Sequence, residues 1–234
     1  MARNGYLGRA ASYLLARPRI YIHAEDCALA RPILETMRPL IAETKLVPLI
    51  RYSEAWTALA NVRQGYLDQA MELLVTLDKD LERLVLPADI TFRPILEWGY
   101  VEAFLAAGDT KKADLHHHRW VSAANRIGEV TWQGLAWEAG VRIALAKNDI
   151  VEARRRLSSA IAAIDGYEAP LASWKIHASA ADTEELLGNH NAARDYRSLS
   201  AATIRVLANS LPDTEPARAG FLTSPRVRHV LQTL

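Results

Sequence analysis

One pattern of residue types recurs along this chain at an interval of about 40 residues. It consists of apolar residues, a turn residue, a short polar stretch and a small alanine. The stretches LAAGDTKKA, ending at Ala113, and LAKNDIVEA, ending at Ala153, show it most clearly. Further copies end at Ala70 and Ala193, and a weaker one ends at Ala30. Copies in phase at this interval predict a repeat architecture, because each unit must stack on its neighbours to bury its apolar face.

Apolar residues within each unit have helical spacing. On both sides of Gly65 they are three or four positions apart, which predicts an amphipathic helix, a break and a second amphipathic helix. Asp109 and Asp149 are placed to cap the second helix of their units. Four residues at the breaks tolerate the left-handed conformation that ends a helix: Gly65, Gly108, Asn148 and Gly188. The expected fold is an all-α solenoid of stacked antiparallel pairs, with about ten to twelve helices.

Prolines indicate where the helix pairs end, because proline disrupts a helix interior. Four of them follow a signature alanine by 17 to 19 residues: Pro48, Pro87, Pro170 and Pro212. The first copy instead contains Pro18, Pro32 and Pro39, which disturb the expected pair. We therefore expect one domain with three parts: irregular N-terminal helices over 1–49, four repeats over 50–210, and a C-terminal cap over 211–234.

The repeat resembles the tetratricopeptide family, in which a large aromatic early in the first helix is followed by a turn glycine and a small alanine in the second. The matching residues are Trp56, Gly65 and Ala70, then Trp98, Gly108 and Ala113, then Trp137, Asn148 and Ala153, then Trp174, Gly188 and Ala193. The spacing exceeds the usual 34 residues of that family. Repeats lengthened to about 40 residues are similar to those in the C-terminal sensor regions of large bacterial transcriptional activators and their ATPase relatives.

Composition limits the classes of partner. With 28 Lys plus Arg and 27 Asp plus Glu, the formal net charge is +1, so no global field favours direct binding to nucleic acid or an anionic membrane. Cys27 is the only cysteine, which fits a reducing compartment. Arg9, Ser12 and Arg17 interrupt any apolar core of a signal sequence, and no stretch approaches the roughly 20 apolar residues of a membrane span. We expect a cytoplasmic protein.

Candidate chemical sites are few, and no metal or other cofactor is predicted. The run His116, His117, His118 cannot converge on one metal ion from consecutive helical positions, so we interpret it as a solvated helix face. We likewise interpret the run Arg154, Arg155, Arg156 as a solvated helix face. A thiolate–imidazole pair between His23 and Cys27 at i,i+4 on a helix is the alternative enzymatic site; in the simpler interpretation Cys27 is a buried apolar residue. The sequence contains no phosphate loop, nucleophile elbow or metalloprotease helix.

The tetratricopeptide resemblance also implies a binding surface, since the first helix of each pair lines the concave groove in that family. The groove positions that match here are Tyr52, Arg63, Trp98, Glu102, Glu138, Arg142, Lys175, Asp182 and Glu185. Glu102, Arg142 and Asp182 are equivalent positions of neighbouring repeats and are expected to form a ladder of alternating charge. The ladder either binds a polar peptide or small effector, or ties neighbouring helices together by about 0–1 kcal/mol per exposed pair.

Three functions follow from these observations. The leading hypothesis is a non-catalytic scaffold that binds a protein, a peptide or a small effector in the groove, within a bacterial signalling or transcription regulator. The alternative from another class is an all-helical enzyme that uses His23 and Cys27. A third is an assembly module of a larger protein. The sequence identifies neither the partner nor the oligomeric state.

Overall fold

The computed structural model describes residues 9, 10 and 12–233, and every regular element in these residues is a helix. The helices are α2 (Ala16–His23), α3 (Cys27–Glu43), α4 (Val47–Arg63), α5 (Leu67–Arg83), the short 3₁₀ helix η1 (Pro87–Thr91), α6 (Arg93–Ala106), α7 (Thr110–Ile127), α8 (Val130–Ala146), α9 (Ile150–Ile164), α10 (Pro170–Leu186), α11 (His190–Asn209), α12 (Pro216–Thr223) and α13 (Pro225–Gln232). The predicted all-α fold is confirmed for the described residues. No helix in this part of the chain is both long and apolar enough to cross a bilayer.

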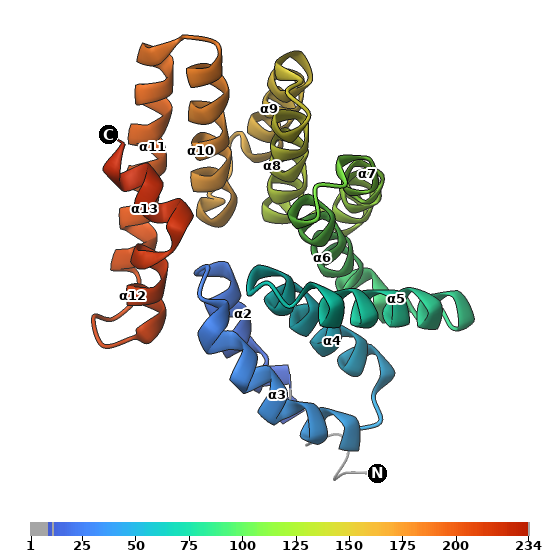
Figure 1. Cartoon of the computed structure of the whole chain (residues 1–234). Helices are drawn as coiled ribbons and strands as arrows, with labels where there is room; N and C mark the ends of the chain where they lie inside the picture. The colour runs from blue at the N-terminus through green and yellow to red at the C-terminus, as the bar shows by residue number, and fades with distance from the viewer. Residues whose placement is uncertain (1–8, 11, 234) are drawn as a thin grey trace.

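Consecutive helices form antiparallel pairs that stack side by side (Figure 1). The pairs are α2 with α3, α4 with α5, α6 with α7, α8 with α9, and α10 with α11. The first helices of the later pairs also pack on one another in turn, α4 with α6, α6 with α8, and α8 with α10. The predicted solenoid of helix pairs is therefore present.

The turns between paired helices lie at the predicted break residues. Gly65, Gly108, Asn148 and Gly188 all have positive φ, between 56° and 82°. Glu25 holds the equivalent position in the first pair and also has a positive φ, 61°, a conformation unusual for a residue with a side chain. The predicted caps are confirmed as well: Asp109 accepts a hydrogen bond from the amide of Lys112, and Asp149 from the amide of Glu152, both at 3.0 Å.

The N-terminal segment differs from the irregular arrangement that its prolines predict. Pro32 and Pro39 lie inside α3, which continues through both over 17 residues. Each proline lacks the amide that would bond to the carbonyl four residues earlier. Those carbonyls belong to Ala28 and Glu35, and both residues are exposed, so water can hydrate the unpaired oxygens. The prolines therefore stay on the solvent side while Leu34 packs in the core.

First and second helices of the pairs are buried to different extents. The second helices α5, α7, α9 and α11 bury one face, which contains the signature alanines Ala70, Ala113, Ala153 and Ala193. The first helices α4, α6, α8 and α10 are buried on nearly all sides. They contact their own partner, the neighbouring pairs and residues from both ends of the chain.

The two ends of the solenoid meet. Tyr21 of α2 donates a hydrogen bond to Glu215 at 3.1 Å, across 194 positions of sequence. Helix α2 lies beside α12 (Figure 1), and the turn that follows it contacts α10 through the ion pair of Glu25 with Lys175. We call this contact of α2 and the turn Ala24–Asp26 with α10 and α12 the seam. In the predicted cap, Phe221, Val227 and Val230 are buried.

Candidate binding site

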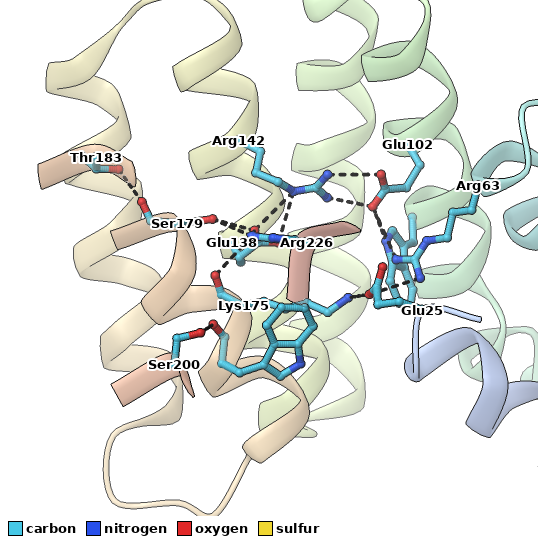
Figure 2. Close-up of polar contacts among 12 residues, drawn as sticks. Glu25, Arg63, Glu102, Glu138, Arg142, Lys175, Ser179, Thr183, Ser200 and Arg226 are labelled. Carbon is cyan, nitrogen blue, oxygen red and sulfur yellow. Dashed lines mark hydrogen bonds and ion pairs between the residues drawn. The ribbon is translucent and has the colours of Figure 1, made fainter. Parts of the chain in front are cut away.

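Seven charged side chains meet on the inner face of the solenoid (Figure 2). We call them the central charge network: Glu25, Arg63, Glu102, Glu138, Arg142, Lys175 and Arg226. Five come from the first helices α4, α6, α8 and α10, because those helices present their inner faces to the common centre. Glu25 comes from the turn after α2 and Arg226 from α13. Four cations therefore alternate with three carboxylates.

Arg142 is the middle of this network. Its guanidinium donates two hydrogen bonds to the Glu102 carboxylate, at 2.7 and 3.2 Å, the bidentate geometry that gives the strongest ion pairs. Its Nε donates to Glu138, one turn earlier on α8, at 3.3 Å. Glu102 also accepts from the indole N–H of Trp98 at 2.8 Å. These contacts fix the Arg142 side chain in one plane between α6 and α8.

The C-terminal helix α13 contributes to the network through Arg226. Its Nη2 donates to Glu138 at 2.6 Å and to the Ser179 hydroxyl at 2.9 Å. The same nitrogen approaches the main-chain oxygen of Lys175 at 3.3 Å. Ser179 in turn donates to Glu138 at 2.7 Å. The cap is thereby tied to α8 and α10 by hydrogen bonds as well as by apolar packing.

Glu25 closes the network at the seam. Its carboxylate pairs with Lys175 of α10 and lies 3.4 Å from the guanidinium of Arg63 on α4. Arg63 also donates to the main-chain oxygen of Ile22 at 2.9 Å and lies 3.8 Å from Glu102. Two basic residues of different repeats thus hold one carboxylate, which arrives from the turn between α2 and α3.

The carboxylates of Glu25 and Glu102 are ionised at neutral pH although they are largely removed from water. Burial alone would raise the pKa of Glu25, but the adjacent Arg63 and Lys175 outweigh burial and lower it to about 2. The same balance, with Arg142 and Arg63 as the cations, holds the pKa of Glu102 well below its usual range. Burial lowers the pKa of Lys175, and the Glu25 carboxylate opposes this change. Removing one partner would leave an uncompensated buried charge.

The predicted groove residues do not all lie at the centre of the charge network. Six of the nine lie at the centre: Arg63, Trp98, Glu102, Glu138, Arg142 and Lys175. Tyr52 is next to them, with its ring 6.2 Å from that of Trp56. Glu185 instead pairs with His190 and Arg197 of α11. The predicted ion pair between Glu102 and Arg142 is present. For its second pair, Arg142 contacts Glu138 of its own helix rather than the predicted Asp182.

Trp98 is not the exposed groove aromatic that the family positions imply. Its side chain is 1% exposed. The ring stacks on Trp120 at 5.5 Å and lies 5.9 Å from Trp132. His23 covers it from α2, at 5.8 Å. The adjacent helices α7 and α8, together with α2, therefore enclose Trp98 in an aromatic core.

Two residues of the network, Glu25 and Arg226, are absent from the set predicted from sequence. Glu25 had a signal: it precedes the signature alanine Ala30 by five positions, like the other break residues, and a glutamate at a position that favours glycine or asparagine is unusual. Arg226 had none. Its contact with Glu138 spans 88 positions and depends on how the cap folds back over α10.

The proposed pair of His23 and Cys27 does not lie on one helix. His23 is the last residue of α2, and Cys27 is the first residue of α3. The i,i+4 face expected for them is broken by the turn between the helices. Cys27 is 4% exposed, and burial raises the pKa of its thiol, so the thiol is protonated at neutral pH. These features match the interpretation of Cys27 as a small core residue.

The histidine and arginine runs are less solvated than predicted, because α7 and α9 each bury one face. His116 and His117 are buried and only His118 is exposed. Arg156 is likewise buried, while Arg154 and Arg155 are exposed.

Three ligand atoms of Asp114, His117 and His118 lie within 4.8 Å of one another, which is a possible arrangement for a metal ion. Asp114, however, already accepts hydrogen bonds from Lys147 and Arg156, each at 2.7 Å. Two cations on the only carboxylate of the cluster disfavour a metal ion there.

Comparison with models of known protein families finds no match for this chain, and no curated protein is significantly similar to it in sequence.

Proposed function

We propose that this chain is a non-catalytic scaffold of the tetratricopeptide type, which binds an acidic peptide segment of a protein partner at the central charge network. The observation that supports the proposal is the environment of Glu25. Arg63 and Lys175 come from α4 and α10, and both hold the same carboxylate. Such convergence of basic side chains from separate repeats suits the recognition of a carboxylate.

In this proposal the turn after α2 occupies the site of the partner. Glu25 stands where a carboxylate of the peptide would bind, and its positive φ makes the bound turn conformationally unfavourable by about 1 kcal/mol or more. A partner that supplies its own carboxylate therefore competes with a strained internal ligand. Binding would displace the turn and expose Arg142 and Glu102 to the remainder of the peptide.

The test compares the wild-type protein with Glu25→Gln on an array of peptides of defined charge. Glu25→Gln removes the internal carboxylate, so we expect it to retain acidic peptides at least about tenfold more strongly than wild type. Glu35→Gln is the matched control, because Glu35 is an exposed residue of α3 whose one ion pair among the described residues is with Arg31. It should behave as wild type. Absence of acidic peptides among those bound by Glu25→Gln would overturn the proposal.

We propose in addition that the scaffold belongs to a bacterial signalling or transcription regulator. This proposal is supported only by the resemblance of its lengthened repeats to sensor regions of bacterial activators. An ATPase or DNA-binding domain encoded in the same reading frame would support it, and a gene that encodes the repeats alone would contradict it.

A further inference from the structure

A pocket of about 400 Å³ lies at the seam, between α2 and the helices α10, α11 and α12. Its wall is mostly apolar and comes from both ends of the solenoid: Ala16, Ile20, Leu171, Leu207, Leu211 and Phe221. The volume falls within the range of small-molecule sites, about 300–1,000 Å³. We call it the seam pocket.

Two polar side chains of α2 line the seam pocket, Arg19 and His23. The Arg19 guanidinium lies over the rings of Tyr52 and Trp56, at 5.7 and 5.8 Å from their centroids. Its Nε is buried and has no hydrogen-bonding partner among the described residues. A buried donor without a partner is unfavourable by about 1–3 kcal/mol, so an acceptor from a ligand would be stabilising.

The charge of Arg19 is also uncompensated in the described part of the chain. Nearby Arg63 and Lys175 share the carboxylate of Glu25. Arg19 forms no ion pair with any of the described residues, and its guanidinium lies over aromatic rings. His23 remains neutral, because burial and the cations Lys175, Arg63 and Arg19 lower its pKa to about 3. The seam pocket therefore combines one free positive charge and a neutral imidazole with an apolar wall.

We propose that the seam pocket binds a small amphipathic carboxylate, with the carboxylate on Arg19 and the apolar body against Ile20, Leu211 and Phe221. A cation selects the anionic end of such a molecule, and the apolar wall selects its hydrocarbon part. The wall belongs to α2 on one side and to α10, α11, the segment that follows α11, and α12 on the other. A bound ligand therefore stabilises the closed seam, since it contacts both sides at once.

Isothermal titration calorimetry with octanoate and octan-1-ol tests this inference, because the two probes differ in charge and share the chain. Wild type should bind octanoate more tightly than octan-1-ol. Arg19→Met should weaken octanoate binding at least about tenfold and leave octan-1-ol unchanged. Arg205→Met is the matched control, an exposed arginine of α11 outside the pocket, and should bind like wild type.

A second variant fills the pocket without removing any charge. Ala16 is exposed at the start of α2 and lines the pocket, so Ala16→Phe should preserve the melting temperature and abolish binding of both probes. Equal affinity of wild type for the two probes, or unchanged octanoate binding in Arg19→Met or Ala16→Phe, would overturn the inference. The result does not depend on peptide binding at the central charge network: octanoate binding without any peptide binding would refute only the proposed function.

Discussion

His117 illustrates how the fold constrains single residues. The side chain is completely buried, and neither ring nitrogen has a hydrogen-bonding partner among the described residues. Its ring packs on α8 at Gly140, where an added Cβ would lie 2.8 Å from His117 Cε1. Burial, with smaller contributions from Arg156 and His118, lowers the pKa of His117 to about 3. The folded protein therefore keeps this imidazole neutral.

This environment predicts a pH dependence of stability. Below about pH 6.5 the unfolded chain takes up a proton at His117, and the folded chain does not until about pH 3. The unfolded state then binds more protons, so the free energy of unfolding decreases as the pH falls through this window. The expected contribution of His117 approaches about 1.4 kcal/mol per pH unit. Urea unfolding between about pH 7 and about pH 5 measures it.

The comparison needs two variants. His117→Gln cannot titrate, so its free energy of unfolding should vary less steeply with pH than that of wild type. His118→Gln alters the exposed neighbour and should retain the wild-type slope. His23, whose pKa is also lowered to about 3, contributes equally to all three proteins. Identical slopes for wild type and His117→Gln would show that His117 is solvated.

At the scale of the helix, close approach within a pair depends on the signature alanines. Ala153 is fully buried near the start of α9. Replacing Ala153 with leucine should overpack the pair and lower the free energy of unfolding by about 1–3 kcal/mol. Val151→Leu is the control, because Val151 is 83% exposed on the same helix and has room for an added methylene. Equal melting curves for Ala153→Leu and wild type would contradict this packing role.

The helices and their turns were predictable from sequence because they depend on local constraints. A residue with positive φ, such as Gly108, and a cap such as Asp109 leave signals within a few positions of each other. Burial of the first helices on nearly all sides was not predictable in the same way. A repeat pattern describes contacts between neighbouring units, whereas Trp98 is covered by His23 of α2 as well as by Trp120 and Trp132 of neighbouring helices. The expected exposed aromatic was wrong for this reason.

At the scale of the whole molecule, closure depends on a glycine. Gly220 of α12 faces the turn between α2 and α3, and an added Cβ would lie 2.6 Å from Asp26 Cγ and 2.8 Å from its Cβ. The site was predictable only where the repeat positions determine it. Glu102 and Arg142 were identified, whereas the contacts of Glu25 with Lys175 and of Arg226 with Glu138 depend on how the two ends of the chain pack against the repeats.

Gly220→Ala should therefore open the seam. The substitution would favour an isolated helix by about 1 kcal/mol, so a loss of stability can be assigned to the contact with Asp26. Hydrogen exchange of α2 and α12 should become faster, while that of α7 and α9 stays unchanged. The double variant Gly220→Ala with Asp26→Gly removes the opposing side chain. Glycine weakens the N-cap of α3 only slightly, so the double variant should restore slow exchange. Wild-type exchange in Gly220→Ala alone would contradict the role of this glycine.

Closure also has a consequence for the order of folding. Each helix pair forms from residues close in sequence, whereas the hydrogen bond from Tyr21 to Glu215 joins positions 194 apart. The entropy lost on closing a loop grows with its length, so contacts of this kind form after the pairs have stacked. We expect the same contacts to break first on unfolding. The earliest opened state would then retain all its stacked pairs and differ from the native protein only in access to its centre.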